Sequence, residues 1–433
     1  MAARPAAAPR PLPFLKGVRV NRCKQRKDSH VAEPARAMIT GQEMEPRAAS
    51  ASPAAEMCAE VLVGSEAYAV LRADWQRLKV LQSTSTVFQS PDFLSIWAKH
   101  FAAGALDRTL RTIVVRAGGR AVAIWPLQVT TRGMIRVASA AGRPFSQYDG
   151  MMLDPGCNQA EAVAKAQAAL VSGERPDLLR FSQLRADNPL FVHLLSRFEP
   201  VESEGAPRAE IGPDGFEAYM KRLKPKLVRE QRRRMRMLEA DGEVGFAVSD
   251  DAETASDWLA KAIDMKRAWL TATGKVSTAY VDERTNTLFR DLARQLGDAT
   301  GQVRLVVAHL TVGGEPIAYE VGLVEAGKFF LYMSSYSDRF ARHGAGNVLA
   351  QLVIEWCAGH GIQVYDMMSP RSQHKSDWKT SEVEVHEYAV PLSRRGEFYL
   401  GFVVRRLRPG LKRAFYALPK PVRSRIAKAA LRI

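Results

Sequence analysis

The stretch 328–378 constrains the fold more than any other part of the chain. It opens with the apolar and aromatic run 329–333, which has the length and composition of a buried strand. Two glycines follow, Gly344 and Gly346, and then apolar residues at the three-and-four spacing of a helix. Residues 362–367 have the pattern of a second strand. The sequence therefore predicts strand, glycine loop, helix and strand, with loop amides at the helix N-terminus, an arrangement that favours a bound phosphate.

The net charge of +16 is concentrated at the two ends of the 433-residue chain. Residues 1–55 contain ten Lys and Arg against four acidic residues, and residues 394–433 contain twelve against one. The body between them, 56–393, holds 40 basic and 41 acidic residues and is close to neutral. With 46% hydrophobic residues the chain has the composition of a globular protein and the length of two domains. The basicity therefore belongs to two appendages and does not mark the folded body as a nucleic-acid-binding surface.

The first 55 residues are rich in Ala, Pro and Arg and lack the continuous apolar core of a signal peptide. We expect them to form a disordered, basic N-terminal extension. A start codon assigned too far upstream would produce the same composition, with three later methionines as alternative starts, Met38, Met44 and Met57. An organellar transit peptide is a third interpretation.

The four cysteines lie far apart and share no spacing typical of a metal site or of a disulfide framework: Cys23, Cys58, Cys157 and Cys357. We therefore expect no metal, and a reducing cytoplasm fits the sequence best. No run of about 18 apolar residues is present, so the sequence predicts no membrane-spanning helix.

The pattern of predicted strands and helices repeats once along the chain. Each half has helices, then a strand, a Gly-Gly turn and a second strand, with the turns at 118–119 and 313–314. An internal duplication of one α/β module is the economical explanation. We expect a first module at 56–205 and a second at 206–393, with the glycine loop in the second.

Two segments combine helical patterning with many basic residues. Residues 215–241 predict a charged helix that Pro225 breaks or kinks. It is either a solvated helix face or a face that meets an anion. The basic tail 394–433 has apolar residues interleaved from Phe398 onward, with prolines that divide it into short helices. Such a tail lies on an anionic membrane surface or a polyanion, or packs on the domain with its arginines outward.

Several of these features together resemble a known family, the GNAT-superfamily proteins labelled cellulose-biosynthesis-associated acetyltransferases, which are related to Fem-type transferases. The resemblance covers roughly residues 60–400. It rests on the second hairpin, the strand ending in Tyr332, the glycine loop and a set of later residues: Tyr336, Ser337, Asp338, Tyr365, Asp366, Lys375 and Trp378. It implies an α/β (α+β) fold of two tandem GNAT-like modules, each a mixed, mainly antiparallel sheet flanked by helices. The first module lacks a phosphate loop.

The resemblance also implies a co-substrate, acetyl-CoA or another acyl-CoA, held without a metal. The expected phosphate loop consists of Arg342, His343, Gly344, Ala345, Gly346 and Asn347. It departs from the family pattern at Ala341, where a Gln or Arg is usual; Arg342 follows one residue later. The two glycines still allow the backbone amides to approach a pyrophosphate.

Three residues are candidates for the chemistry of acyl transfer, which needs a base, oxyanion donors and an acid for the thiolate. Glu320 is the first candidate base because it is the only acid in the apolar strand 317–323, where burial raises a carboxyl pKa; an outward or salt-bridged position is the alternative. Asp366 is a second base or a structural partner of Lys375. Tyr336 is either the acid for the thiolate or a packing residue.

The expected acceptor contacts come from both modules: Tyr148 and Asp149 in the loop 142–150, and Lys375 and Trp378. The resemblance implies N- or O-acyl transfer to an amine or hydroxyl of a small molecule or saccharide, including polysaccharide or cell-envelope precursors. The expected location is the cytoplasm or the inner face of a membrane. One alternative is a Fem-like transferase that uses aminoacyl-tRNA, with the basic helix facing the tRNA. The other is a catalytically degenerate fold that serves as a binding module.

Overall fold

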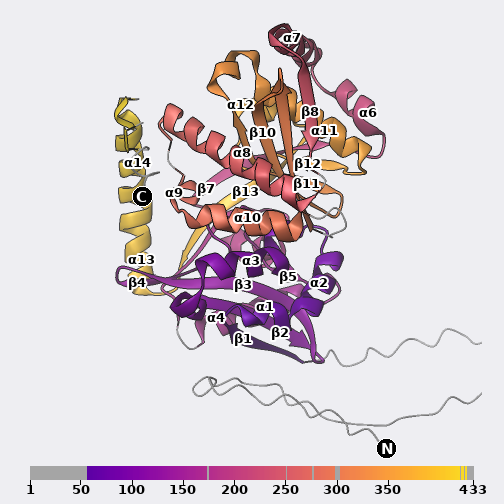
Figure 1. The fold of residues 1–433 in the computed structure, drawn as a ribbon. Helices are drawn as coiled ribbons and strands as arrows, with labels where there is room; N and C mark the ends of the chain where they lie inside the picture. The colour runs from indigo at the N-terminus through magenta and orange to yellow at the C-terminus, as the bar shows by residue number, and fades with distance from the viewer. Residues whose placement is uncertain are drawn as a thin grey trace, which may run out of the picture.

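The computed structural model describes residues 56–172, 175–249, 251–275, 277–297, 303–419, 421–423 and 425–426. The predicted N-terminal extension, 1–55, lies outside the described residues. The described strands form one continuous mixed sheet in the order β1-β2-β3-β4-β6-β13-β7-β12-β11-β10-β9-β8, with β5 beside β3 (Figure 1). Their bounds are β1 Met57–Val63, β2 Leu110–Ala117, β3 Arg120–Arg132, β4 Ile135–Ala140, β5 Met152–Leu153, β6 Leu178–Arg185, β7 Glu202–Glu210, β8 Val244–Val248, β9 Val303–Val312, β10 Glu315–Glu325, β11 Lys328–Tyr336, β12 Val364–Asp366 and β13 Ser381–Pro391.

Helices cover both faces of this sheet, and several begin at the signals in the sequence. Ser90 accepts a hydrogen bond from the amide of Phe93 and caps α3, and Pro225 opens α7, so the charged segment 215–241 is two helices. The bounds are α1 Glu66–Val70, α2 Arg72–Leu81, α3 Pro91–Phe101, α4 Gln159–Val171, α5 Pro189–His193, α6 Gly215–Arg222, α7 Pro225–Asp241, α8 Ala252–Thr273, α9 Thr278–Val281, α10 Arg284–Leu296, α11 Ala345–Gly359, α12 Gln373–Trp378, α13 Arg394–Tyr399 and α14 Arg408–Ala417.

The two halves repeat one module, as the sequence pattern predicts. Both hairpins, β2/β3 and β9/β10, turn at two glycines with nearly the same positive φ angles, 56° and 83° at 118–119 and 58° and 80° at 313–314. Each module then contains one pair of parallel strands joined through a helix: β4 and β6 through α4, and β11 and β12 through α11. The remaining pairings are antiparallel, which confirms the predicted mixed, mainly antiparallel α/β fold.

The last strand of each module pairs with the other module. β7, which ends the first half of the chain, pairs with β12 of the second, and β13, near the end of the chain, pairs with β6 of the first. The two exchanged strands also pair with each other. The predicted boundary at 205/206 falls inside β7, so the chain crosses between the modules along a strand and not through a linker.

One large hydrophobic core lies between the modules and joins them. It combines α1–α3 of the first module with α8 and α10 of the second, and two smaller cores lie under α4 and under α11 on the opposite sheet face. At the rim of the shared core, Asp291 on α10 accepts from Lys99 at 2.6 Å and lies 2.9 Å from Nε2 of His100, both on α3. The modules therefore form one body, in which the stretch 328–378 contacts the first module through Tyr332 and Asp366.

The C-terminal tail forms α13, a π-helical segment η5 (Leu400–Leu407) and α14, which runs along the left side of the molecule in Figure 1. Among the described elements α14 packs mainly against η5. Several apolar side chains of the tail are exposed: Phe398 (72%) on α13, Phe402 (51%) on η5 and Leu411 (62%) on α14. Within the described ranges, no helix is long and apolar enough to cross a membrane.

Candidate functional site

The parallel strands β11 and β12 separate after three residue pairs. Lys328, Phe329 and Phe330 lie opposite Val364, Tyr365 and Asp366, and β12 then ends, whereas β11 continues to Tyr336. Beyond this point two carbonyls of β11 accept from side chains: that of Tyr332 from Nε2 of Gln147 (3.2 Å) and that of Ser334 from Nζ of Lys266 (2.9 Å). We call this part of the sheet the β11/β12 opening.

The predicted glycine loop stands at the end of β11. A short 3₁₀ segment, η4 (Asp338–His343), leads into Gly344, whose φ of +68° is a conformation that side chains rarely adopt. Helix α11 begins at Ala345, and no described side chain caps its N-terminus. Its first amides and the positive end of its dipole therefore suit a phosphate group.

The residues flanking these glycines are held by neighbouring helices. Nε2 of His343 lies 3.2 Å from the carboxylate of Asp241 at the end of α7. Oδ1 of Asn347 lies 2.5 Å from Nδ1 of His374 on α12. Arg342 is exposed. Of the six predicted loop residues, the segment from Gly344 to Gly346 thus forms the helix start, while His343 and Asn347 fasten it to α7 and α12.

Two half-buried lysines lie at the opening. Nζ of Lys375 donates to the carbonyls of Met368 and Pro370, both at 3.0 Å. Burial lowers the pKa of Lys375 to about 8. Burial, with repulsion from Lys275 and Lys375, also lowers the pKa of Lys266 to about 8. Two cations in partial burial near an uncapped helix start make this a site for an anionic or electron-rich group.

Two of the predicted catalytic residues, Tyr336 and Glu320, differ in their exposure. Tyr336 is half-buried at the strand end, beside Gly346, and its ring meets that of Trp269 at 6.3 Å. Glu320 is 1% exposed beneath α11 and accepts a hydrogen bond of 2.8 Å from the hydroxyl of Tyr365. Burial raises the pKa of Glu320 to about 8. Tyr336 thus borders the opening, whereas Glu320 belongs to the core below it.

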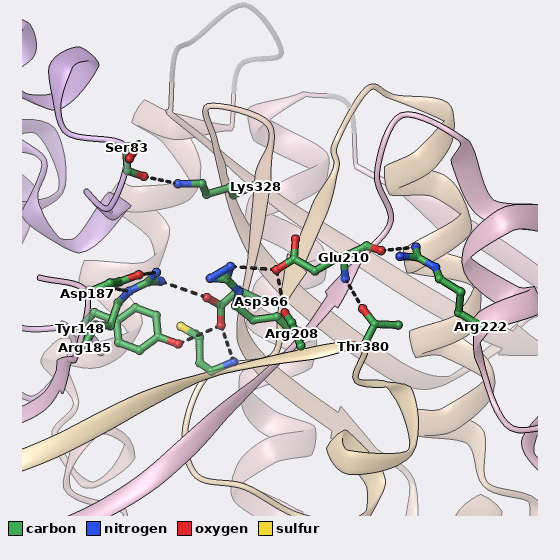
Figure 2. A network of polar contacts seen from close by, with 12 residues as sticks. Ser83, Tyr148, Arg185, Asp187, Arg208, Glu210, Arg222, Lys328, Asp366 and Thr380 are labelled. Carbon is green, nitrogen blue, oxygen red and sulfur yellow. Dashed lines mark hydrogen bonds and ion pairs between the residues drawn. The ribbon is translucent and has the colours of Figure 1, made fainter.

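Asp366 ties the two modules together (Figure 2). Its carboxylate accepts from the hydroxyl of Tyr148 at 2.9 Å and from the amide of Met368 at 2.8 Å, and it lies 3.5 Å from Nη1 of Arg185. Burial raises its pKa, an effect opposed by Arg185 and Arg208. The sequence prediction made Asp366 either a second base or a structural partner of Lys375. In the structure its hydrogen-bond and ion-pair partners are Tyr148, Arg185 and Met368. Its charge also acts on Lys375, where it favours the protonated form against the burial that lowers the pKa.

The remaining predicted acceptor residues are buried. Asp149 binds Arg143 (3.1 Å) and the amide of Ser182 (2.7 Å), and burial raises its pKa. Trp378 is fully buried, and its carbonyl accepts from Tyr219 at 2.6 Å. Tyr148, Asp149 and Trp378 therefore hold the structure around the site.

Other residues of the loop 142–150 do face a surface groove between the modules. This junction groove has a volume of about 510 Å³ and a polar lining that includes Arg143, Gln147, Glu202, Glu204, Ser369 and His386. Gln147 also reaches the β11/β12 opening, and Pro370, which lines the groove, shares Nζ of Lys375 with Met368. The groove and the opening therefore meet at these residues.

Sequence reasoning missed Lys266, and it did not single out Gln147 within the loop 142–150 or Arg234 within the basic helix. Lys266 is one of several charged residues on the α8 helix and is separated from its partner Ser334 by 68 positions. Gln147 reaches Tyr332 across 185 positions. A Cβ built on Gly344 would lie 2.9 Å from Cδ of Arg234 on α7. Their placement depends on tertiary contacts that no local pattern encodes.

The part of the chain that the structure describes holds no group of three or more His, Cys, Asp or Glu that could bind a metal ion. No curated protein matches the sequence at a significant level. Among solved structures, FemX is 11% identical with a TM-score of 0.48, covering 74% of this chain and 99% of FemX. A tandem GNAT protein from the clavulanic acid biosynthesis pathway is 12% identical with a TM-score of 0.41, covering 78% and 99%.

A GCN5-related N-acetyltransferase from Sphaerobacter thermophilus is 13% identical with a TM-score of 0.35, covering 77% of this chain and 95% of its own. At such identities the likeness concerns the fold alone. The sequence match is more specific: residues 225–379, which include the glycine loop, match the model of the Acetyltransferase (GNAT) domain. Over these residues the sequence of the second module is thus similar to a GNAT acetyltransferase domain.

Proposed function

We propose that the protein is an acyltransferase that uses acetyl-CoA or another acyl-CoA, bound by the second module. The observation that carries the proposal is the uncapped start of α11 after Gly344, placed at the wide end of the β11/β12 opening. The amides of Ala345 and Gly346 would receive the pyrophosphate. The pantetheine arm would follow the edge of β11 past Ser334 toward the junction groove.

The residues at the opening suit the chemistry of acyl transfer. The nucleophile attacks the thioester carbonyl carbon, the new C–N or C–O bond forms, and the C–S bond breaks. The Lys266 ammonium would stabilise the oxyanion, and Tyr336 would protonate the departing thiolate. Lys375, at the boundary of opening and groove and with a pKa near 8, is better placed than the buried Glu320 to take the proton of the nucleophile.

The junction groove supports an acceptor that carries amines or hydroxyls. Glu202 and Glu204 supply carboxylates for an ammonium group, and Ser369 and Gln147 supply hydrogen bonds. A saccharide or a cell-envelope precursor fits this polar lining, and the sequence resemblance to cellulose-biosynthesis-associated acetyltransferases points to the same class. We propose such a molecule as the acceptor.

Calorimetry with acetyl-CoA tests the donor. We expect saturable binding to the wild type, and loss of transfer to an amine acceptor in Lys266→Met and Lys375→Met. Lys261→Met is the matched control, because Lys261 is an exposed lysine on the same helix as Lys266, α8. Absence of acetyl-CoA binding to the wild type would overturn the proposal.

A second candidate function rests on helix α7, which exposes Arg229, Arg232, Arg233 and Arg236. This basic face would bind the backbone of a charged tRNA in a Fem-like transferase. Salt-dependent binding of charged tRNA, together with no binding of acetyl-CoA, would favour this candidate. If neither donor binds, the fold serves as a binding module.

We also propose that the tail, 394–433, holds the enzyme at an anionic membrane surface. Its exposed Phe398, Phe402 and Leu411 lie among basic residues such as Arg405 and Arg406. Exposed apolar side chains combined with cations are the chemistry that binds a surface of acidic lipids. A cytoplasmic enzyme attached in this way would act on acceptors presented at the membrane.

A further inference from the structure

A cavity of about 370 Å³ lies between α7 and α11, next to the glycine loop. Its walls come from α7, through Gln231, Arg232, Met235 and Arg236, and from the first turns of α11, through Val348. Glu239 and Gln351 complete the lining. The cavity therefore combines an apolar wall with two cations and one carboxylate, and it lies beside the helix start that suits a pyrophosphate.

The carboxamide of Gln231 is a buried polar group in the wall of this cavity. The residue is 3% exposed, and neither Nε2 nor Oε1 has a hydrogen-bond partner within the described structure. A buried amide without partners costs free energy, and such groups in folded proteins are normally satisfied. A ligand that offers a donor and an acceptor side by side would satisfy both atoms. The exocyclic amine and a neighbouring ring nitrogen of adenine form such an edge, which glutamine binds with two hydrogen bonds.

The arginines add an anion site to the same cavity. Arg232 and Arg236 lie one helical turn apart, are exposed, and form no ion pair with any described residue. The neighbouring Arg233, in contrast, is paired with Glu230 at 2.7 Å. Two unpaired guanidinium groups on one helix face are a ready binding site for a phosphate.

The path from the glycine loop to this cavity is short. Arg234, three residues after Gln231, lies directly against Gly344, so α7 crosses the start of α11. Val348 stands four residues after Gly344, one helical turn into α11. A ligand with its pyrophosphate at Gly344 would therefore have its nucleoside within reach of Gln231.

We propose that this cavity binds the adenine and the phosphorylated ribose of the acyl-CoA. Gln231 reads the adenine edge, and Arg232 and Arg236 bind the ribose phosphate. The inference rests on the proposed function, and it assigns to the basic helix α7 a role in selecting the donor. It also gives a role to the neutral glutamine that is buried on the inner face of α7 beside its exposed arginines.

The test compares three thioesters by calorimetry: acetyl-CoA, acetyl-dephospho-CoA, which lacks the ribose phosphate, and acetyl-phosphopantetheine, which lacks the whole nucleotide. Gln231→Leu should weaken acetyl-CoA about tenfold and leave acetyl-phosphopantetheine unchanged. The double variant Arg232→Ala/Arg236→Ala should weaken acetyl-CoA to the affinity of acetyl-dephospho-CoA, and should not change the latter. Arg233→Ala is the matched control on the same helix, with unchanged affinity for all three.

The outcomes separate this inference from the proposed function. Equal binding of acetyl-CoA and acetyl-phosphopantetheine by the wild type, or unchanged acetyl-CoA binding in Gln231→Leu and in the double arginine variant, would overturn the inference and leave the proposed function standing. No binding of any thioester to the wild type would overturn both. Thermal denaturation checks that each variant is folded; Gln231→Leu removes an unsatisfied amide and should retain the stability of the wild type.

Discussion

The two modules differ at the point where their parallel strands part. In the first module β4 and β6 pair over Val137–Ser139, and the connection to α4 then returns to the sheet. Asp149 of that connection bridges to Leu184, and its carboxylate binds the amide of Ser182. In the second module the connection is the glycine loop, and side chains of Gln147 and Lys266 meet the edge of β11. The two modules thus share one topology. In the first module the chain itself returns to the edge of β6, whereas in the second module side chains of Gln147 and Lys266 reach the edge of β11.

The sheet interiors differ in the same way. The sixth residue after the Gly-Gly turn is Trp125 in the first module, stacked on Phe181 at 5.9 Å, and Glu320 in the second, bonded to Tyr365. An apolar aromatic pair at one position corresponds to a carboxyl and a hydroxyl at the other. The difference teaches that the first copy is built for packing, whereas the second carries polar groups that packing alone does not require.

The largest expected effect tests the contact between the modules. Asp366→Ala leaves the buried Arg185 guanidinium without one of its carboxylates and should lower the free energy of unfolding by about 3 kcal/mol. Urea denaturation measures it. Asp187→Ala is the control: this carboxylate also pairs with Arg185 at 2.6 Å but is 38% exposed, so its loss should cost less than about 1 kcal/mol. Equal losses would show that burial between the modules is not what makes Asp366 important.

The next effect tests the glycine loop. Gly344→Val requires a positive φ from a β-branched residue and places Cβ against Arg234, so we expect about a 100-fold loss of acetyl-CoA affinity. Gly133→Val, in a turn of the first module with a φ of +61° and open space around it, carries similar backbone strain without the site. Calorimetry on both variants decides the question, and a comparable loss in Gly133→Val would refute a specific role of the loop.

A third effect is the pH dependence that Glu320 adds. Its pKa is raised from 4.5 unfolded to about 8 folded, so the folded state holds the extra proton between these values. The free energy of unfolding should therefore fall as pH rises from 4.5 to 8, by at most about 1.4 kcal/mol per pH unit, and level off above 8. Glu320→Gln removes this slope. Urea denaturation of both proteins at pH 6, 7 and 8 should show diverging stabilities; parallel curves would contradict the assignment.

The smallest effect compares the tail with the body. Arg405→Ala/Arg406→Ala should weaken binding to vesicles containing acidic lipid about tenfold, while acetyl-CoA affinity stays unchanged. Arg120→Ala, whose side chain is 59% exposed on the first module, is the control with unchanged vesicle binding. Vesicle co-sedimentation at two salt concentrations gives the measurement. Equal binding by all three proteins would remove the tail from the membrane proposal.

Local signals in the sequence predicted most of the fold. The Gly-Gly turns, the cap at Ser90, the break at Pro225 and the unit 328–378 each depend on neighbouring residues, and each is present in the structure. The exchange of β7 and β13 was not predicted, because a strand carries the same alternation whichever module it joins. The glycine loop was found by its residue types. The placements of Lys266, Gln147 and Gln231 were not, because their chemistry comes from burial against distant elements.

The exchange of strands has a consequence for how the protein is made. The far edge of β6 is covered by β13, which follows it in the chain only after the whole of the second module's sheet and helices. The first module, which is synthesised first, therefore exposes an unpaired strand edge until β13 has been translated, and such edges pair with strands of other chains. A chain truncated before β13 would leave this strand edge exposed and would be prone to aggregate. The first module is therefore completed only when the second module has been synthesised as well.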